Sequence, residues 1–166
     1  MKTIAIYPGS FNPFTVGHQN ILEKAERIFD EVIIAVGQNP AKPHTETYTI
    51  QNGNVVLSKE PRHEVIGELL NRDVESYDGY LTDYIRNKVN NSEEDIKIVL
   101  VRGLRNGDDL DYEVNQLRVM EDMLGEPIDV VFITCDREFE HISSTVCRQM
   151  ELIRKNTSLI YYPSAR

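Results

Sequence analysis

The strongest constraint on the fold of this chain is a loop near its amino terminus, rich in Gly and Pro: YPGSFNPFTVGH, residues 7–18. It follows an apolar run at residues 3–6 and precedes a segment with apolar positions at helical spacing. A strand that enters a helix through such a loop is typical of open α/β sheets, which bind phosphate there. Backbone N–H groups at the helix start offer partial positive charge, and glycine lets a ligand approach the main chain. The loop therefore predicts a phosphate site, with His18 as an additional side-chain donor.

Strand and helix signals alternate along the rest of the chain. Apolar runs predict strands at residues 3–7, 31–36, 74–77, 96–101 and 128–134. Apolar positions at helical spacing predict helices at residues 17–29, 61–70, 80–89, 111–124 and 144–155. This alternation indicates an α/β fold with a doubly wound parallel sheet. At 166 residues we expect one domain, residues 1–166.

One segment interrupts the alternation. Residues 45–58 contain β-formers on either side of Asn52-Gly53, which is a strong signal for a hairpin. We therefore expect a β-hairpin inserted between the second strand and the next helix. Its role is open among a lid over the site, an oligomer contact and decoration of the fold.

Two arginines follow the predicted strand at residues 96–101. Arg102 and Arg105 would lie at its carboxyl end, where ligands meet such sheets. Guanidinium groups suit phosphate oxygens because they donate two parallel hydrogen bonds. The alternative is that they form ion pairs with Asp108, Asp109 or Asp111, which are close in sequence.

A third group of polar residues comes at the start of the last predicted helix. Ser143, Ser144 and Thr145 combine hydroxyl groups with free backbone N–H groups, which together can bind an anion, although ordinary helix capping would use the same residues. Lys42 follows the second predicted strand near the same sheet edge, where a surface lysine is the alternative. Jointly these segments predict a ligand rich in phosphate that is held by three loops.

Composition and missing motifs narrow the function. A formal net charge of −9 argues against a general nucleic-acid binder. Cys135 and Cys147 lack the paired spacing of a zinc site and are expected to be reduced thiols. We find neither a P-loop, nor Gly-x-Gly-x-x-Gly after the first strand, nor a Gly-x-Ser-x-Gly elbow. With no signal-peptide pattern and no run of membrane-spanning length, we expect a cytoplasmic protein that does not contact membranes.

Several motifs resemble those of a known family. TVGH at residues 15–18 and ISST at residues 142–145 resemble the paired signature of the nucleotidyltransferases. The loop at residues 7–18, RGLR at residues 102–105, DYE at residues 111–113 and YDGYLTDY at residues 77–84 resemble bacterial phosphopantetheine adenylyltransferases. The resemblance covers roughly residues 2–43 and 60–150 and implies a Rossmann-like nucleotidyltransferase fold.

The resemblance also implies an activity and a set of site residues. Members of this family transfer AMP from ATP to 4′-phosphopantetheine, giving dephospho-coenzyme A and pyrophosphate in coenzyme A biosynthesis, with magnesium and typically as a homohexamer. By this resemblance, the residues that hold ATP would be Ser10, Phe11, His18, Gly103, Leu104, Arg105, Glu113, Phe139, Glu140, His141, Ile142, Ser143, Ser144 and Thr145. Those that hold phosphopantetheine would be Ser10, Lys42, Leu81 and Arg102.

The chemistry of the residues agrees with this activity. The attacking phosphate is already ionised, so neither a general base nor a covalent intermediate is required, and catalysis consists of alignment and charge neutralisation. We expect His18 to donate to the α-phosphate, Ser10 and Lys42 to orient the attacking phosphate, and residues 143–145 to bind the β- and γ-phosphates. The open alternatives are a nicotinamide mononucleotide adenylyltransferase, a cytidylyltransferase, a catalytically silent nucleotide-binding protein and a purely structural α/β domain.

Overall fold

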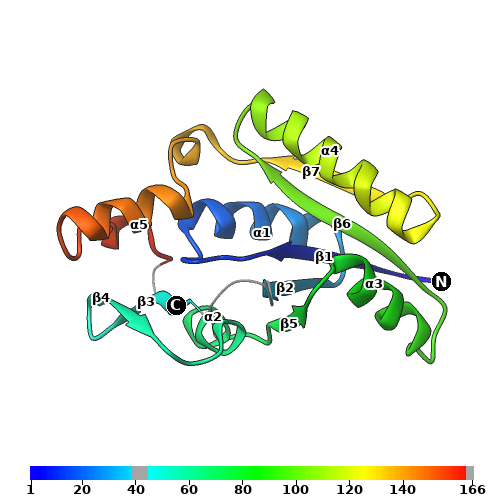
Figure 1. Ribbon diagram of the computed structural model, residues 1–166, viewed down its shortest axis with the longest axis horizontal. Helices are drawn as coiled ribbons and strands as arrows, with labels where there is room; N and C mark the ends of the chain where they lie inside the picture. The colour runs from blue at the N-terminus through cyan, green and yellow to red at the C-terminus, as the bar shows by residue number, and fades with distance from the viewer. Residues whose placement is uncertain (39–44, 164–166) are drawn as a thin grey trace.

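The computed structural model describes residues 1–38 and 45–163 and contains a sheet of five parallel strands (Figure 1). Its strand order is β5-β2-β1-β6-β7. The strands are β1 (Lys2–Gly9), β2 (Val32–Gln38), β5 (Glu75–Asp78), β6 (Ile96–Leu104) and β7 (Asp129–Thr134). Every neighbouring pair in this sheet is parallel, as the apolar runs predicted.

Helices cover both faces of the sheet (Figure 1). They are α1 (Val16–Ile28), α2 (Arg62–Leu70), α3 (Leu81–Asn90), α4 (Gly107–Leu124) and α5 (Ser144–Ile153). Successive side chains of β1 point to opposite faces. Tyr7 therefore packs with residues of α1 and α2, whereas Ile6 packs with residues of α3 and α4. This arrangement confirms the expected doubly wound α/β fold.

The order of the strands creates a crevice at the carboxyl edge of the sheet. β1 lies between β2 and β6, and the chain leaves β1 toward α1 on one face but leaves β6 toward α4 on the other. The loops that follow β1 and β6 therefore diverge. In open α/β sheets such a switch point is where ligands bind. The loop at residues 7–18 and the loop after β6 meet at this position.

The hairpin expected at residues 45–58 is present. β3 (Thr47–Gln51) and β4 (Asn54–Ser58) pair antiparallel and form a separate sheet of two strands. Both turn residues have positive φ, 51° at Asn52 and 75° at Gly53, as a tight hairpin turn requires. The hairpin lies beside α2, at the lower left of Figure 1, near α5.

Two element boundaries differ from the sequence prediction by three residues or more. α4 begins at Gly107 and not at residue 111, because the Asn106 side chain accepts a hydrogen bond from the N–H of Asp109 and caps the helix. Asp108 and Asp109 then occupy the first turn, where negative charge is favoured. β6 also continues to Leu104, three residues beyond the expected end at residue 101, because it pairs with β7 as far as Thr134.

No helix in the described ranges, residues 1–38 and 45–163, combines the length and apolar character needed to cross a bilayer.

The cap of α4 gives a first prediction. Substituting Asn106→Ala removes the side chain that accepts from Asp109, so the free energy of unfolding should fall by about 1 kcal/mol. Urea denaturation measures this change. Asn91→Ala is the matched control, because Asn91 lies exposed at the end of α3 and its side chain makes no hydrogen bond with the described residues. Equal losses in the two variants would show that the cap contributes nothing.

Candidate active site

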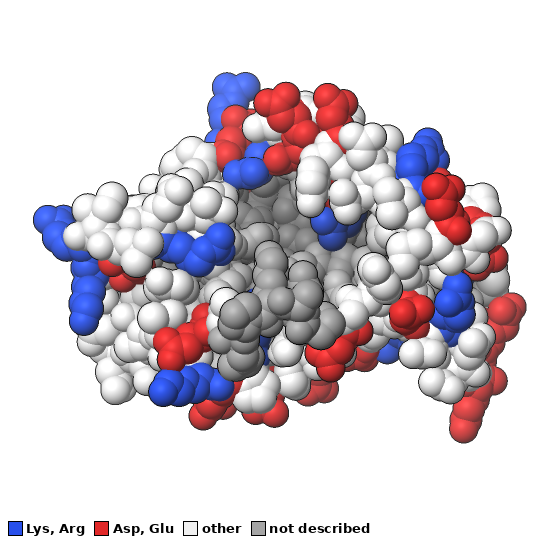
Figure 2. Space-filling view, in the orientation of Figure 1, with Lys and Arg blue, Asp and Glu red and all other residues white. Residues whose placement is uncertain are grey.

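A cleft of about 310 Å³ opens at the switch point between β1 and β6. Its walls come from the loop after β1, the start of α1, the loop after β6 with the start of α4, and the segment between β7 and α5. Figure 2 shows this face of the molecule hollowed at its centre, with basic side chains at the border of the hollow and acidic ones on the outer rim. The three segments that the sequence singled out thus meet in one cleft.

Thr15 and His18 cap the start of α1 reciprocally. The Thr15 hydroxyl accepts a hydrogen bond from the N–H of His18 at 3.3 Å. In return, the N–H of Thr15 donates to Nδ1 of His18 at 3.0 Å. Because Nδ1 is used as an acceptor, the proton of the neutral ring belongs on Nε2. Because the cap uses Nδ1, the Nε2–H group on the opposite side of the ring is left to donate. His18 lines the cleft.

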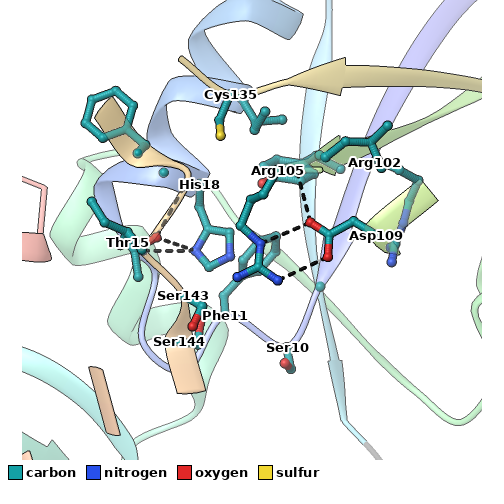
Figure 3. A pocket seen from close by; sticks show the side chains of 18 of the residues that line it. Ser10, Phe11, Thr15, His18, Arg102, Arg105, Asp109, Cys135, Ser143 and Ser144 are labelled. Carbon is teal, nitrogen blue, oxygen red and sulfur yellow. Dashed lines mark hydrogen bonds and ion pairs between the residues drawn. The ribbon is translucent and has the colours of Figure 1, made fainter. Parts of the chain in front are cut away.

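The surroundings of His18 keep its ring neutral. The ring packs edge-to-face on Phe11 at 5.1 Å and against Phe14 at 5.4 Å between centroids. Burial, together with the positive charge of Arg105, lowers the pKa of His18 to about 4. Figure 3 shows the imidazole beside the Arg105 side chain at the centre of the cleft. At neutral pH the cleft therefore contains a neutral hydrogen-bond donor.

Phe11 is a support for this arrangement. Its side chain is 3% exposed and its φ is 46°, which is unusual for a residue other than glycine. The ring lies directly against Gly9, where a Cβ would come within 2.7 Å of Phe11 Cζ. Gly9 thus makes room for the ring that supports His18.

Arg102 forms a bidentate ion pair at the end of β6. Its Nε donates to one oxygen of Glu113 at 2.6 Å, and its Nη2 donates to the other at 2.8 Å. Nη1 donates to the carbonyl of Pro8 at 3.3 Å. The sequence suggested an aspartate at residue 108, 109 or 111 as the partner. Arg102 pairs instead with Glu113, which lies further along α4. This pair links β6, α4 and the end of β1.

Arg105 pairs with Asp109, one of the partners that the sequence suggested. Nε and Nη2 donate to the two carboxylate oxygens of Asp109 at 3.0 and 3.1 Å. The backbone N–H of Arg105 donates to the same side chain at 2.9 Å. This contact holds the loop after β6 against the first turn of α4 (Figure 3). Nη1 of Arg105 makes no hydrogen bond with the described residues and is free to donate to a ligand.

The hydroxyl groups at the start of α5 have separate tasks. Ser143 caps the helix by accepting from the N–H of Val146 at 3.1 Å, which leaves its own proton free. Ser144 instead donates to the carbonyl of Pro13 at 2.8 Å. Its proton is therefore committed to the loop after β1. Thr145 accepts from Arg148 at 3.3 Å. Within this trio, Ser143 is the hydroxyl best placed to donate to an anion.

Hydrogen bonds and an ion pair that join α1 to the segment after β7 form a clamp that the sequence did not predict. Asn20 donates to the carboxylate of Asp136 at 2.9 Å and accepts from the Asp136 N–H at 2.8 Å. Lys24 adds an ion pair to Asp136 at 2.7 Å. The clamp fixes the start of the segment that carries Phe139. Its partners are 116 residues apart, so no local pattern could have revealed it.

Most of the expected site residues lie together. Those that line the cleft are Ser10, Phe11, His18, Arg102, Gly103, Leu104, Arg105, Glu113, Phe139, Ile142, Ser143 and Ser144. Four others do not line it: Leu81, the first residue of α3, packs against the core cluster that contains Ile6, His141 packs on Tyr161, and Glu140 and Thr145 are exposed. Lys42 lies outside the described residues.

Comparison with known proteins extends these observations to the whole chain. Residues 6–150 match the family described as cytidylyltransferase-like. The chain is 35% identical over 154 residues to the phosphopantetheine adenylyltransferase of Leptospira biflexa, covering 90% of this chain and 84% of that protein. It is 33% identical over 161 residues to the phosphopantetheine adenylyltransferase of Ralstonia pickettii, covering 97% and 87%.

A solved structure shares the fold. Plasmodium falciparum nicotinic acid mononucleotide adenylyltransferase, complexed with NaAD, matches with a TM-score of 0.64 at 15% identity, covering 99% of this chain and 92% of that one. At this low identity the likeness concerns the fold. It confirms the Rossmann-like nucleotidyltransferase architecture that the motifs implied.

The state of His18 is a testable consequence of this geometry. At pH 7 the ring should be neutral with its proton on Nε2, and it should titrate near pH 4. The ¹⁵N chemical shifts of its ring report both, with His18→Gln identifying the resonances. Since the unfolded chain binds this proton below about pH 6.5, His18 should destabilise the fold as the pH falls from about 6.5 to about 4. A proton on Nδ1, or titration at pH 6.5 or above, would contradict the assignment.

Proposed function

The chain belongs to the cytidylyltransferase-like family of nucleotidyltransferases, and from that premise we propose that it transfers AMP from ATP to 4′-phosphopantetheine. The products are dephospho-coenzyme A and pyrophosphate. The observation that carries this proposal is the position of His18, a neutral Nε2–H donor at the start of α1, between the loops after β1 and β6. Similarity to phosphopantetheine adenylyltransferases over most of the chain supports this choice of acceptor.

The proposed reaction is one in-line displacement. A phosphate oxygen of the acceptor attacks the α-phosphorus of ATP, the bond from this phosphorus to the β-phosphate oxygen breaks, and pyrophosphate leaves with that electron pair. The His18 Nε2–H would donate to an α-phosphate oxygen as negative charge builds there. The free N–H groups at the start of α1 would also stabilise this negative charge. The remaining contribution is alignment, and no covalent intermediate on the chain is involved.

The other walls of the cleft suit the leaving pyrophosphate. The Ser143 hydroxyl and the N-terminus of α5 would bind the β- and γ-phosphates, as would the free Nη1 of Arg105. Phe139 and the backbone of residues 103–104 would contact the rest of the nucleotide. Asp109 keeps Arg105 oriented toward the nucleotide, and Glu113 keeps Arg102 oriented at the end of β6.

The acceptor would enter on the side of Ser10. Ser10 is exposed at the end of β1 and lines the cleft, so its hydroxyl can orient the attacking phosphate together with Lys42. Arg102 and Leu81 would contact the acceptor further along the sheet edge, where Leu81 follows β5. These assignments rest on the sequence resemblance and on the place of the elements in the sheet.

We further propose that ATP binds as its magnesium complex. Mg²⁺ prefers phosphate oxygens supplemented by one or two carboxylates. Asp109 and Glu113 line the cleft, and an arginine holds each of them. Both oxygens of each carboxylate already accept from that arginine, so the triphosphate oxygens would supply the ion's main ligands, and the ion would neutralise charge on the leaving pyrophosphate.

Self-association into a homo-oligomer, a hexamer by resemblance, is also part of the proposal. α4 supports it because none of its residues is buried within the described chain. Tyr112, Val119 and Met123 are 62%, 55% and 40% exposed. A second copy could cover these apolar side chains.

The choice of acceptor is tested by pyrophosphate release. The protein is incubated with ATP, magnesium and either 4′-phosphopantetheine, nicotinamide mononucleotide or nicotinic acid mononucleotide, and CTP replaces ATP in a parallel series. We expect release with ATP and phosphopantetheine. Release with a mononucleotide instead would reassign the acceptor, dependence on CTP would reassign the nucleotide, and no release in any mixture would indicate a silent nucleotide-binding protein.

The role of His18 is tested by substitution. His18→Ala removes the Nε2–H donor, and kcat should fall by about 10²–10³ while ATP affinity changes little, as for the loss of one transition-state donor. His18→Gln retains an amide N–H and should lose less. Circular dichroism checks that α1 has kept its fold after loss of the cap. An unchanged kcat in His18→Ala would remove His18 from this role.

A further inference from the structure

The carbonyl groups of the loop after β1 are held from outside that loop. The carbonyl oxygen of Ser10 accepts from Arg62 at 3.2 Å, that of Asn12 from Arg148 at 2.6 Å, and that of Pro13 from Ser144 at 2.8 Å. Neither arginine lines the cleft described above. The two peptide groups that they bind therefore direct their oxygens away from the cleft. The environment that this loop presents to a ligand thus depends on residues outside the cleft.

The inserted hairpin is attached to the same loop. The Asn12 side chain donates to the carbonyl of Glu46 at 3.1 Å and accepts from the N–H of Tyr48 at 2.8 Å. Asn12 is 8% exposed, so its side chain is buried. The hairpin is thus joined to the loop by a side chain that uses both its donor and its acceptor.

Arg62 connects the loop, the hairpin and α2. Besides the Ser10 carbonyl, it reaches the Thr47 hydroxyl from Nε at 3.1 Å. Its Nη2 donates to the Thr45 hydroxyl at 2.7 Å and to the Thr45 carbonyl at 3.2 Å. All of these acceptors are neutral. Arg62 is 9% exposed and is the first residue of α2, where positive charge opposes the helix dipole.

The charge of Arg62 has no partner of opposite sign in the described chain. Arg102 and Arg105 each pair with a carboxylate, whereas Arg62 and Arg148 form no ion pair with any described residue. Burial, and then the neighbouring Arg148, lower the pKa of Arg62. A buried charge without a counter-ion is costly, and this one occurs in a chain of net charge −9. An anion bound at Ser10 would offset that cost.

We propose that Arg62 is a positioning residue for the attacking phosphate of the acceptor. It holds the Ser10 carbonyl from behind, fixes the loop to the hairpin, and supplies an unneutralised positive charge beside the acceptor subsite. The hairpin then supports this loop. It is neither a lid over the site nor decoration of the fold. This inference rests on the proposed function, because it takes Ser10 as the place of the acceptor phosphate.

The test separates charge from shape with two matched pairs of variants. Arg62→Gln removes the charge and Arg62→Lys keeps it. Thr45→Asp places a carboxylate against the guanidinium, while Thr45→Asn adds the same bulk without charge; Thr45 is exposed, so both should fold. The KM for phosphopantetheine should rise about tenfold in Arg62→Gln and Thr45→Asp, which remove or neutralise the charge. It should rise less than about threefold in Arg62→Lys and Thr45→Asn, which keep the charge. The KM for ATP should change less than about twofold in all four. Arg72→Gln is a control, because Arg72 pairs with Glu26 away from the cleft.

The outcomes are distinct. Equal KM values for phosphopantetheine within each pair, or a parallel rise in the KM for ATP, would overturn the proposal, since a merely structural role moves both substrates together. If the wild-type protein does not turn over phosphopantetheine, the proposed function fails. In that case, calorimetry measures the affinity of each variant for inorganic phosphate. The inference is supported if Arg62→Gln and Thr45→Asp bind phosphate about tenfold more weakly than the wild-type protein, and it is overturned if they bind phosphate equally well.

Discussion

The reciprocal hydrogen bonds between Thr15 and His18 are the interaction on which the rest of the site depends. They close the first turn of α1, so they fix the direction in which the chain leaves the sheet after β1. They also assign the two ring nitrogens, because Nδ1 is used within the cap and Nε2 is left to donate into the cleft. A single capping interaction therefore sets both the geometry of a helix start and the chemistry of the imidazole that lines the cleft.

The arginines in and around the site form two groups that differ in the charge of their partners. On the side of β6 the arginines are each held by a carboxylate of α4, which orients the guanidinium groups and reduces their net charge. On the side of the hairpin, Arg62 and Arg148 bind carbonyl oxygens and hydroxyl groups and keep their full charge. Under the proposed function, Arg105 would offer directed donors to the triphosphate and Arg102 to the acceptor, while Arg62 would add an unneutralised charge beside the acceptor phosphate. The acidic chain as a whole thus contains a locally positive edge.

The sequence predicted the architecture well because its signals are local. Buried parallel strands appear as apolar runs, the Asn52–Gly53 turn selects a hairpin, and helix starts carry their own caps. The helix α4 begins four residues before its predicted start, because the Asn106 side chain caps it. Local pattern also indicates that Ser10, His18 and Ser143 surround one ligand, and all three line the same cleft.

The partners of the side chains could not be predicted in the same way. The Arg102–Glu113 pair, the Asn20–Asp136 clamp and the contacts of Arg62 depend on tertiary distances that no spacing encodes. Ser144 illustrates the difference, since a hydroxyl at a helix start suggests an anion ligand, yet its proton is used to hold Pro13.

The central claim is that these residues align two phosphates for direct transfer without becoming part of the reaction themselves. Stereochemistry at the α-phosphorus tests it most directly. The reaction is run with one diastereomer of adenosine 5′-O-(1-thiotriphosphate) and phosphopantetheine, and the configuration of the thiophosphate product is determined. A single in-line displacement predicts inversion at phosphorus. Retention would require a covalent intermediate on the protein and would contradict the account.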